Sequence, residues 1–334
     1  SAVLLGVVLL AASCALSSRR VSDPAASVAR LRSGGGIREE VDLLAQPLVR
    51  SGEVHGMVVG LMTPDKVVRT YGYGRSGRPS DTEPPGADAI FQVGSITKVF
   101  VVSLLAILVD EGKLSYEDTV RSMLPEGVPI RADIGRLTLR ELAAQSGGLP
   151  RQPADFPQFR HLMVYLFTGR NLYGHINREY LYEYLRVYHL KPEGKRGYTY
   201  SNIGVALLAH LIEIKTGRSV PDLIDEKICR PLEMRDTVFV LNAEQQTRLA
   251  VGHVGDQPKF VRRNTPMAPW DMGEIMRASG GLYSTVNDLM VFARSNLGLS
   301  HNSLDPILAT THRVQIRTPA EDMAGPEPSD EDIP

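Results

Sequence analysis

Residues 91–100 read FQVGSITKVF, and this stretch constrains the fold more than any other. A short β-prone run precedes Gly94, and from Ile96 the chain is apolar on nearly every side until Asp110. A helix that is apolar all round is buried in the centre of a protein. We therefore predict a strand, a turn at Gly94 and a central helix that begins beside Ser95.

Ser95 and Lys98 form the only Ser-x-x-Lys match in the chain. Residues i and i+3 of a helix share a face, so the lysine amine can approach the serine hydroxyl. The Ser95 backbone N–H would lie at the positive end of the helix, where an oxyanion can be held. An unpaired ammonium is costly inside an apolar helix, which favours a chemical role over the alternative of a surface lysine in a frayed first turn.

Tyr200-Ser201-Asn202 is the only Tyr-x-Asn match, and it stands just before another strongly apolar run. A phenol on a loop would give up its proton more readily if the fold brought it next to the Lys98 cation, which makes Tyr200 a candidate general base. The Asn202 amide has both donors and acceptors, which suits it to hold a substrate amide and to orient Lys98. The alternative for Asn202 is a helix N-cap.

Hydrophobic spacing and turn residues outline the other elements. We predict a hairpin around Thr63-Pro64-Asp65 and a helix stopped by Gly147-Gly148. Residues 151–197 are predicted to form a helical segment over one side of a cleft. Cys229 has apolar neighbours and is predicted to be a buried small hydrophobe.

Together these segments resemble the serine β-lactamase-like superfamily, in the branch of class C β-lactamases, D-alanyl-D-alanine carboxypeptidases and related esterases. The resemblance runs in order from about residue 37 to about residue 300. It is carried by FQVGSITKVF, LTLRELAAQSGGLP, PEGKRGYTYSNIGVALLAHLIEIKTG, RPLEMRDTVF and SGGLYSTVNDLMVFARSNL. Ser-x-x-Lys is the nucleophile motif of such enzymes.

The resemblance implies an α+β fold, an α/β sandwich in which an antiparallel sheet is flanked by helices beside an all-helical lobe. It implies Ser95 as the acyl-accepting nucleophile, Lys98 as its activating partner, Tyr200 as proton acceptor and donor, and Asn202 as the substrate-positioning amide. The implied reaction is hydrolysis of an amide or ester bond, in a β-lactam, a D-Ala-D-Ala-type peptide or a small ester, through an acyl-enzyme. No metal or cofactor is expected, since the eight histidines show no ligand spacing.

The family completes its groove with Lys-Thr-Gly or His-x-Gly on a strand that follows the SGGLYST region. Lys215-Thr216-Gly217 comes too early and is predicted to end a helix. His253-Val254-Gly255 also precedes that region and matches a hairpin-like stretch of the relatives, so it is a weak candidate. We therefore expect a domain without its last strands, either because the recorded chain is a fragment or because the protein has lost them.

The N-terminal residues have the features of an export signal. An apolar run in residues 1–15 is too short to span a bilayer and is followed by small residues and Cys14. We predict an exported periplasmic or cell-envelope protein, lipid-anchored if Cys14 is acylated; the alternative is an ordinary signal peptide with an incidental cysteine. Residues 16–36 are predicted as a flexible tether, 37–318 as the hydrolase domain and 319–334 as a disordered acidic tail.

The charge balance limits the partners. Lys and Arg number 37 against 38 Asp and Glu, so no net field attracts nucleic acid. We expect a small-molecule or peptide substrate, with peptidoglycan as a candidate, and membrane contact only through the N-terminal lipid anchor. Two other functions stay open. One is a non-catalytic envelope protein that binds peptidoglycan or a partner, and the other is a cytosolic esterase.

Overall fold

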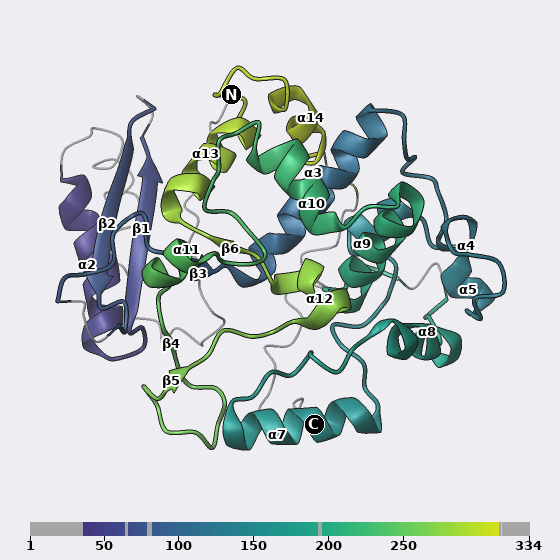
Figure 1. Cartoon of the computed structure of the whole chain (residues 1–334), viewed down its shortest axis with the longest axis horizontal. Helices are drawn as coiled ribbons and strands as arrows, with labels where there is room; N and C mark the ends of the chain where they lie inside the picture. The colour runs from purple at the N-terminus through teal and green to yellow at the C-terminus, as the bar shows by residue number, and fades with distance from the viewer. Residues whose placement is uncertain (1–35, 64–65, 79–81, 193–195, 314, 316–334) are drawn as a thin grey trace.

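A computed structural model describes residues 36–63, 66–78, 82–192, 196–313 and 315. The predicted signal with Cys14, nearly all of the tether and the acidic tail lie outside the described residues. The described part folds into a hairpin layer on one side and a large helical body on the other (Figure 1).

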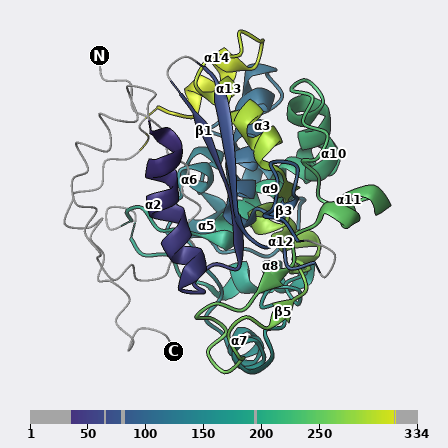
Figure 2. The same cartoon turned by 90° about the vertical axis from the view of Figure 1, so that its left-hand side faces the viewer.

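The hairpin layer is formed by β1 (Gly56–Met62) and β2 (Val68–Gly74), which pair antiparallel from Gly56↔Gly74 to Met62↔Val68. The predicted hairpin is therefore confirmed. Helix α2 (Ile37–Arg50) lies against β2, as Figure 1 shows, and Figure 2 shows α2 on the outside of the hairpin layer; a small apolar core joins α2 and β2. On the other side of the hairpin, α13 (Val286–Asn296) approaches β1 so closely that a Cβ at Gly60 would lie 2.6 Å from Val286.

Helix α3 (Thr97–Asp110) is the predicted central helix, and its burial confirms that prediction. Ten of its fourteen residues are buried, and it packs against α9, α10, α12 and α14. Fully buried Phe100 stacks on Phe292 with ring centroids 4.2 Å apart. Helix α3 follows β3 (Phe91–Gln92) and a short turn of helix, η1 (Gly94–Ile96).

The helical body surrounds α3. Side-chain caps at Thr119, Thr138, Asp155, Asn177 and Ser201 begin five of its helices, each of them accepting a hydrogen bond from a backbone N–H three residues on. Its helices are α4 (Val120–Met123), α5 (Ala132–Gly135), α6 (Leu139–Ala143), α7 (Phe156–Thr168), α8 (Arg178–Val187), α9 (Asn202–Thr216), α10 (Val220–Ile224), η3 (Asp225–Cys229), α11 (Ala243–Arg248), α12 (Gly273–Gly280) and α14 (Asp305–Thr310).

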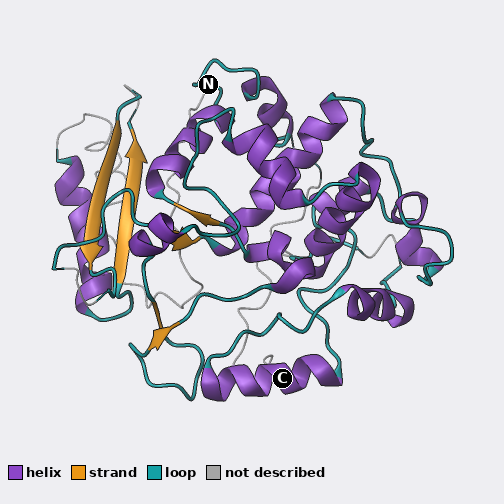
Figure 3. Cartoon of the chain, in the orientation of Figure 1, coloured by secondary structure: helices purple, strands orange, loops and turns teal. Residues whose placement is uncertain are grey.

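Two small strand pairs lie between the layers. β3 pairs antiparallel with β6 (Tyr283–Ser284), and β4 (Gly252–His253) pairs with β5 (Pro266–Met267). With the β1–β2 hairpin, these make three two-stranded sheets in the described part of the chain. Strands and helices both contribute to the core, and helices predominate (Figure 3), so the predicted α+β class is confirmed.

Two local predictions are refined by the structure. Helix α6 ends at Ala143, before Gly147-Gly148, because Gln145 takes a left-handed conformation with φ 56°. Residues 151–197 do contain two helices, α7 and α8.

Among the described helices, none combines the length and apolar character needed to cross a bilayer.

Candidate active site

Ser95 lies in the turn that joins β3 to α3. Gly94 has φ 53°, a conformation that glycine adopts without strain, and the Thr97 hydroxyl donates to the Gly94 carbonyl over 2.6 Å. Val93 N–H donates to the carbonyl of Leu282, next to β6, which fixes the start of the turn. Ser95 is exposed, and its backbone N–H stands at the positive end of α3, where anions are stabilised.

Lys98 is buried beside the Ser95 hydroxyl. Its Nζ donates to Ser95 Oγ at 3.0 Å and to the Ser279 carbonyl at 2.6 Å. Only 5% of the residue is exposed, so it is not a surface lysine in a frayed turn. Burial, together with a smaller effect of the nearby Arg151 guanidinium, lowers the pKa of Lys98 to about 7. Near neutral pH a large share of the side chain is therefore the free amine.

Tyr200 reaches the same hydroxyl from the other side. Its phenol donates to Ser95 Oγ at 2.5 Å. Lys98 Nζ lies 4.9 Å from the Tyr200 ring centroid, and the Arg151 guanidinium carbon lies 5.4 Å from it. Lys98 and Arg151 thus both lie near the face of one aromatic ring beside the serine.

Asn202 is the first residue of α9 and is 7% exposed. Its Nδ2 donates to Tyr173 Oη at 3.3 Å, and Tyr173 Oη donates to Gln152 Oε1 at 3.1 Å. The amide therefore bonds to Tyr173, and the expected bond to Lys98 is not formed. Ser201 is the N-cap of α9, because its Oγ accepts from Gly204 N–H, so the cap alternative for Asn202 is wrong.

The loop between α6 and α7 holds the Tyr200 segment in place. Gln145 accepts from Thr199 N–H through its carbonyl, at 2.8 Å, and from Ser201 N–H through its side chain, at 2.6 Å. The Arg151 carbonyl accepts from Asn202 N–H at 3.1 Å. These bonds bracket Tyr200 on both sides, so its phenol is aimed at Ser95 by backbone that is itself fixed.

A family model for the β-lactamases matches residues 41–327, which is most of the chain. The chain belongs to the β-lactamase family. Its relatives in this family include the D-alanyl-D-alanine-carboxypeptidase/endopeptidase AmpH of Escherichia coli, 29% identical over 252 residues that cover 75% of this chain and 59% of AmpH. Penicillin-binding protein 4* of Bacillus subtilis is 26% identical over 268 residues, covering 76% of this chain and 55% of that protein.

Solved structures agree on the fold of this β-lactamase family chain. A class C β-lactamase from Rhodobacter sphaeroides matches 80% of the chain and 68% of its own, with a TM-score of 0.64 and 25% identity. Another class C β-lactamase matches with a TM-score of 0.67 and 23% identity. The chain spans little more than half the length of the curated relatives it matches.

The triplets that resemble the family's third motif lie in other places. Lys215-Thr216-Gly217 ends α9, and Gly217 takes the left-handed conformation with φ 67° directly after the last helical residue, as predicted. His253 lies in β4, which pairs with β5, so His253-Val254-Gly255 is part of a hairpin as the sequence predicted. The His253 ring stacks on His55 at 3.6 Å, at the edge of the hairpin layer.

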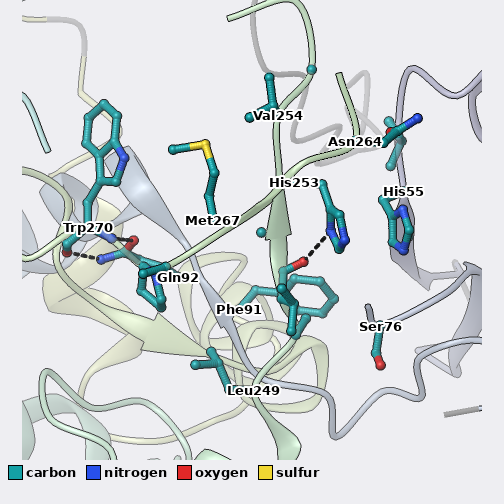
Figure 4. Close-up of a pocket in the computed structure, with 18 of the residues that line it drawn as sticks. His55, Ser76, Phe91, Gln92, Leu249, His253, Val254, Asn264, Met267 and Trp270 are labelled. Atoms are coloured by element: carbon teal, nitrogen blue, oxygen red, sulfur yellow. Dashed lines mark hydrogen bonds between the residues drawn. The ribbon is translucent and has the colours of Figure 1, made fainter. Parts of the chain in front are cut away.

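A cavity of about 460 Å³ lies beside the strand that leads to Ser95 (Figure 4). Gln92 forms one wall and bonds to Trp270 twice, accepting from its backbone N–H at 3.0 Å and donating to its carbonyl at 2.8 Å. The His55 and His253 rings lie face to face on the far wall. Burial, with His253 and Arg75, lowers the pKa of His55, which favours its neutral form.

Sequence reasoning missed Gln145, Arg151, Tyr173 and Ser279. Gln145 lies in LTLRELAAQSGGLP, which carried the family resemblance but was assigned no site role, and Arg151 follows that stretch directly. Ser279 contributes only its backbone carbonyl, which accepts from Lys98, and a pattern of side chains cannot predict the role of a backbone carbonyl. Among the described residues, no group of three or more His, Cys, Asp or Glu side chains is placed to hold a metal ion.

Proposed function

We propose that the protein is a serine hydrolase that acts on amide or ester bonds through an acyl-enzyme at Ser95. One observation carries the proposal: Ser95 Oγ lies within hydrogen-bond distance of both Lys98 Nζ, at 3.0 Å, and the Tyr200 phenol, at 2.5 Å. A serine hydroxyl is a weak nucleophile until a neighbouring base takes its proton. An amine with a pKa near 7 is suited to that task at neutral pH.

In the proposed reaction, Lys98 takes the Ser95 proton as Oγ bonds to the substrate carbonyl carbon. The oxyanion forms at the N-terminal end of α3, where the Ser95 N–H can donate to it. The bond to the leaving nitrogen or oxygen then breaks, and Tyr200 passes a proton to the leaving group. In the second half, water attacks the ester carbonyl and gives a proton to the Tyr200 phenolate. The bond from the acyl carbon to Ser95 Oγ then breaks, and Lys98 returns its proton to Oγ.

We propose D-Ala-D-Ala-type peptides and β-lactams as the first substrates to try, with small esters next. AmpH, a D-alanyl-D-alanine-carboxypeptidase/endopeptidase, and penicillin-binding protein 4* support this choice by their names. Asn202 would hold the substrate amide, since its side chain is positioned by Tyr173 beside the site. The same relatives and the apolar N-terminal run support our proposal that the protein is exported to the cell envelope.

The test is to incubate the full chain with a fluorescent penicillin and, separately, with p-nitrophenyl acetate, and to map any adduct by mass spectrometry. We expect label on Ser95, none on the Ser95→Ala variant, and burst kinetics with the ester. A folded parent with neither adduct nor turnover contradicts the proposal. If that parent still binds an acyl-D-Ala-D-Ala peptide, and Ser95→Ala binds it equally well, the protein is a binding protein instead.

Cell fractionation tests the proposed location. We expect the protein in the envelope fraction, with Cys14 at the mature N-terminus if it is lipidated. A full-length chain that stays in the cytosol with its N-terminal run uncleaved would instead favour a cytosolic esterase.

A further inference from the structure

The outward face of α7 carries an exposed apolar stripe. Phe156, Phe159, Met163 and Phe167 follow one another at spacings of three and four residues, so they share one side of the helix. Phe156 is 76% exposed, Phe167 56% and Phe159 47%. The opposite side faces the molecule, since Gln158 is buried and Tyr165 packs edge-on against Trp270 at 5.5 Å.

A neighbouring loop extends this stripe. Phe260 is 61% exposed and stacks on Phe167 with ring centroids 4.5 Å apart. Its N–H donates to the Leu166 carbonyl at 3.1 Å, which ties the loop to the end of α7. Phe156, Phe159, Met163, Phe167 and Phe260 together form what we call the α7 ridge. In Figures 1 and 2, α7 lies at one end of the molecule, at the periphery of the helical body.

Basic side chains border the α7 ridge. Arg160, Arg170, Lys259 and Arg262 are all exposed, and within the described part of the chain none of the four forms an ion pair with a carboxylate. The only acidic residue in the loop, Asp256, is already paired with Arg263 at 3.7 Å. Asp155, the N-cap of α7, accepts from the Tyr180 hydroxyl, so basic side chains still outnumber acidic ones beside the ridge, although the whole chain has a net charge of −1.

We propose that the α7 ridge docks on the surface of an anionic lipid membrane. The helix would lie in the plane of the interface, with its aromatic side chains at the boundary between headgroups and acyl chains and its basic side chains on the headgroups. Exposed contiguous apolar patches mark interaction sites. A helix that combines Phe on one side with Lys and Arg beside it fits a membrane interface.

Charge argues against a second copy as the occupant. A symmetric dimer would place the same patch of both chains face to face. The unpaired Arg160, Lys259 and Arg262 of one copy would then approach those of the other, which is electrostatically unfavourable. Anionic headgroups instead neutralise these cations. This contact goes beyond the proposed hydrolase activity and adds a second route to the membrane beside the expected lipid anchor at Cys14.

Vesicle binding of the full chain tests the proposal. We expect co-sedimentation with phosphatidylglycerol–phosphatidylethanolamine vesicles, little with pure phosphatidylcholine, and a decrease as salt rises from about 0.05 to about 0.5 M. The triple variant Phe156→Ser, Phe159→Ser, Phe167→Ser should partition at least about tenfold less. The matched control is Leu43→Ser, Leu44→Ser, Val240→Ser, which removes three similarly exposed apolar side chains elsewhere and should bind as the parent does.

A second measurement locates the contact, since the apolar N-terminal run could itself hold the chain on vesicles. Trp270 is the only tryptophan, so Phe159→Trp in a Trp270→Phe background reports on the ridge alone. We expect its fluorescence to be quenched by brominated phosphatidylglycerol. Bound chain with unquenched fluorescence, no binding at all, or a parent dimer that the triple variant dissociates would each overturn the proposal. Ester hydrolysis by the triple variant should equal that of the parent, which separates this result from any failure of the proposed activity.

Discussion

Lys98 combines a buried position with a nearby second cation, and this combination sets the pH range in which its amine is free. Burial and, to a smaller extent, Arg151 together lower its pKa to about 7. Removal of Arg151 should therefore raise the pKa, so that more of the amine is protonated at a given pH. In the parent we expect the acylation rate to rise with pH, with a midpoint near pH 7. In Arg151→Gln we expect that midpoint to move to higher pH.

The measurement for Lys98 is the rate of acylation by an activated ester between pH 5 and 9. Arg178→Gln is the control, since that arginine is exposed and paired with Glu274 in α12. A midpoint that stays where it is in Arg151→Gln would show that Lys98 is not the group being titrated.

The Tyr200 hydroxyl can be removed without the ring. Tyr200→Phe keeps the aromatic face under Lys98 and Arg151 but loses the bond to Ser95 Oγ. Proton transfer by a positioned group contributes about 10²- to 10⁴-fold, so we expect acylation to slow within that range. Tyr198→Phe, two residues away and 56% exposed, should leave the rate unchanged. Stopped-flow absorbance with a chromogenic cephalosporin measures both rates, and equal losses in the two variants would point to a general loosening of the loop.

How far each residue could be predicted depends on whether its side chain forms a local pattern. Ser95 and Lys98 were predictable because three residues along a helix bring two side chains together. The bond from Tyr200 to Ser95 could not be derived from spacing, since 105 residues separate them. Its prediction came from the family resemblance. The Ser279 carbonyl had no sequence signal at all, because every residue carries one.

At the scale of elements, Gln145 connects α6 to the Tyr200 segment. Its left-handed backbone costs a non-glycine residue about 1 kcal/mol, which is offset by the bond from Ser201 N–H. Gln145→Gly relieves the backbone and removes that bond, whereas Gln145→Ala removes the bond and keeps the unfavourable φ. We expect both to slow acylation, and Gln145→Ala to be less stable than Gln145→Gly by about 1 kcal/mol in urea unfolding. Normal acylation in Gln145→Gly would contradict a positioning role.

The two sides of α3 should respond differently to truncation. Phe100 is fully buried against Phe292, so Phe100→Ala should lower the free energy of unfolding by about 3–5 kcal/mol. Val99, its neighbour, is 47% exposed, and Val99→Ala should change the free energy of unfolding by less than about 1 kcal/mol. Chemical denaturation followed by circular dichroism compares them. Similar losses in both would mean that α3 is not the central helix.

The apolar pattern predicted α3 and the hairpin well, because burial on all sides and alternation are both properties of a short stretch. The end of α6 was predicted less well. Gly147-Gly148 suggested the stop, but Gln145 already leaves the helical conformation. The exposed side of α7 could not be anticipated, since an apolar stripe looks the same in sequence whether it faces the core or the solvent.

On the scale of the whole molecule, Cys229 is a reporter of global unfolding. It is 2% exposed, and burial raises the pKa of its thiol to about 12, so the thiolate is scarce in the native state. We expect iodoacetamide to modify Cys229 only at denaturant concentrations that unfold the domain, with peptide mapping to distinguish it from Cys14. Modification well below the unfolding midpoint would reveal that the η3 region opens by itself.

The pairing of β3 with β6 has a consequence for when activity can appear. The first turn of α3, directly after Ser95, is held by two hydrogen bonds to residues far along the chain. Lys98 donates to the carbonyl of Ser279, 181 residues later, and Thr97 accepts from the N–H of Leu282, 185 residues later. Such distant contacts form late, because a long loop must close first. During synthesis the ribosome must therefore release the chain past Ser284 before Ser95 is set in place. The proposed hydrolase activity would therefore be absent from the nascent chain until most of its domain had emerged.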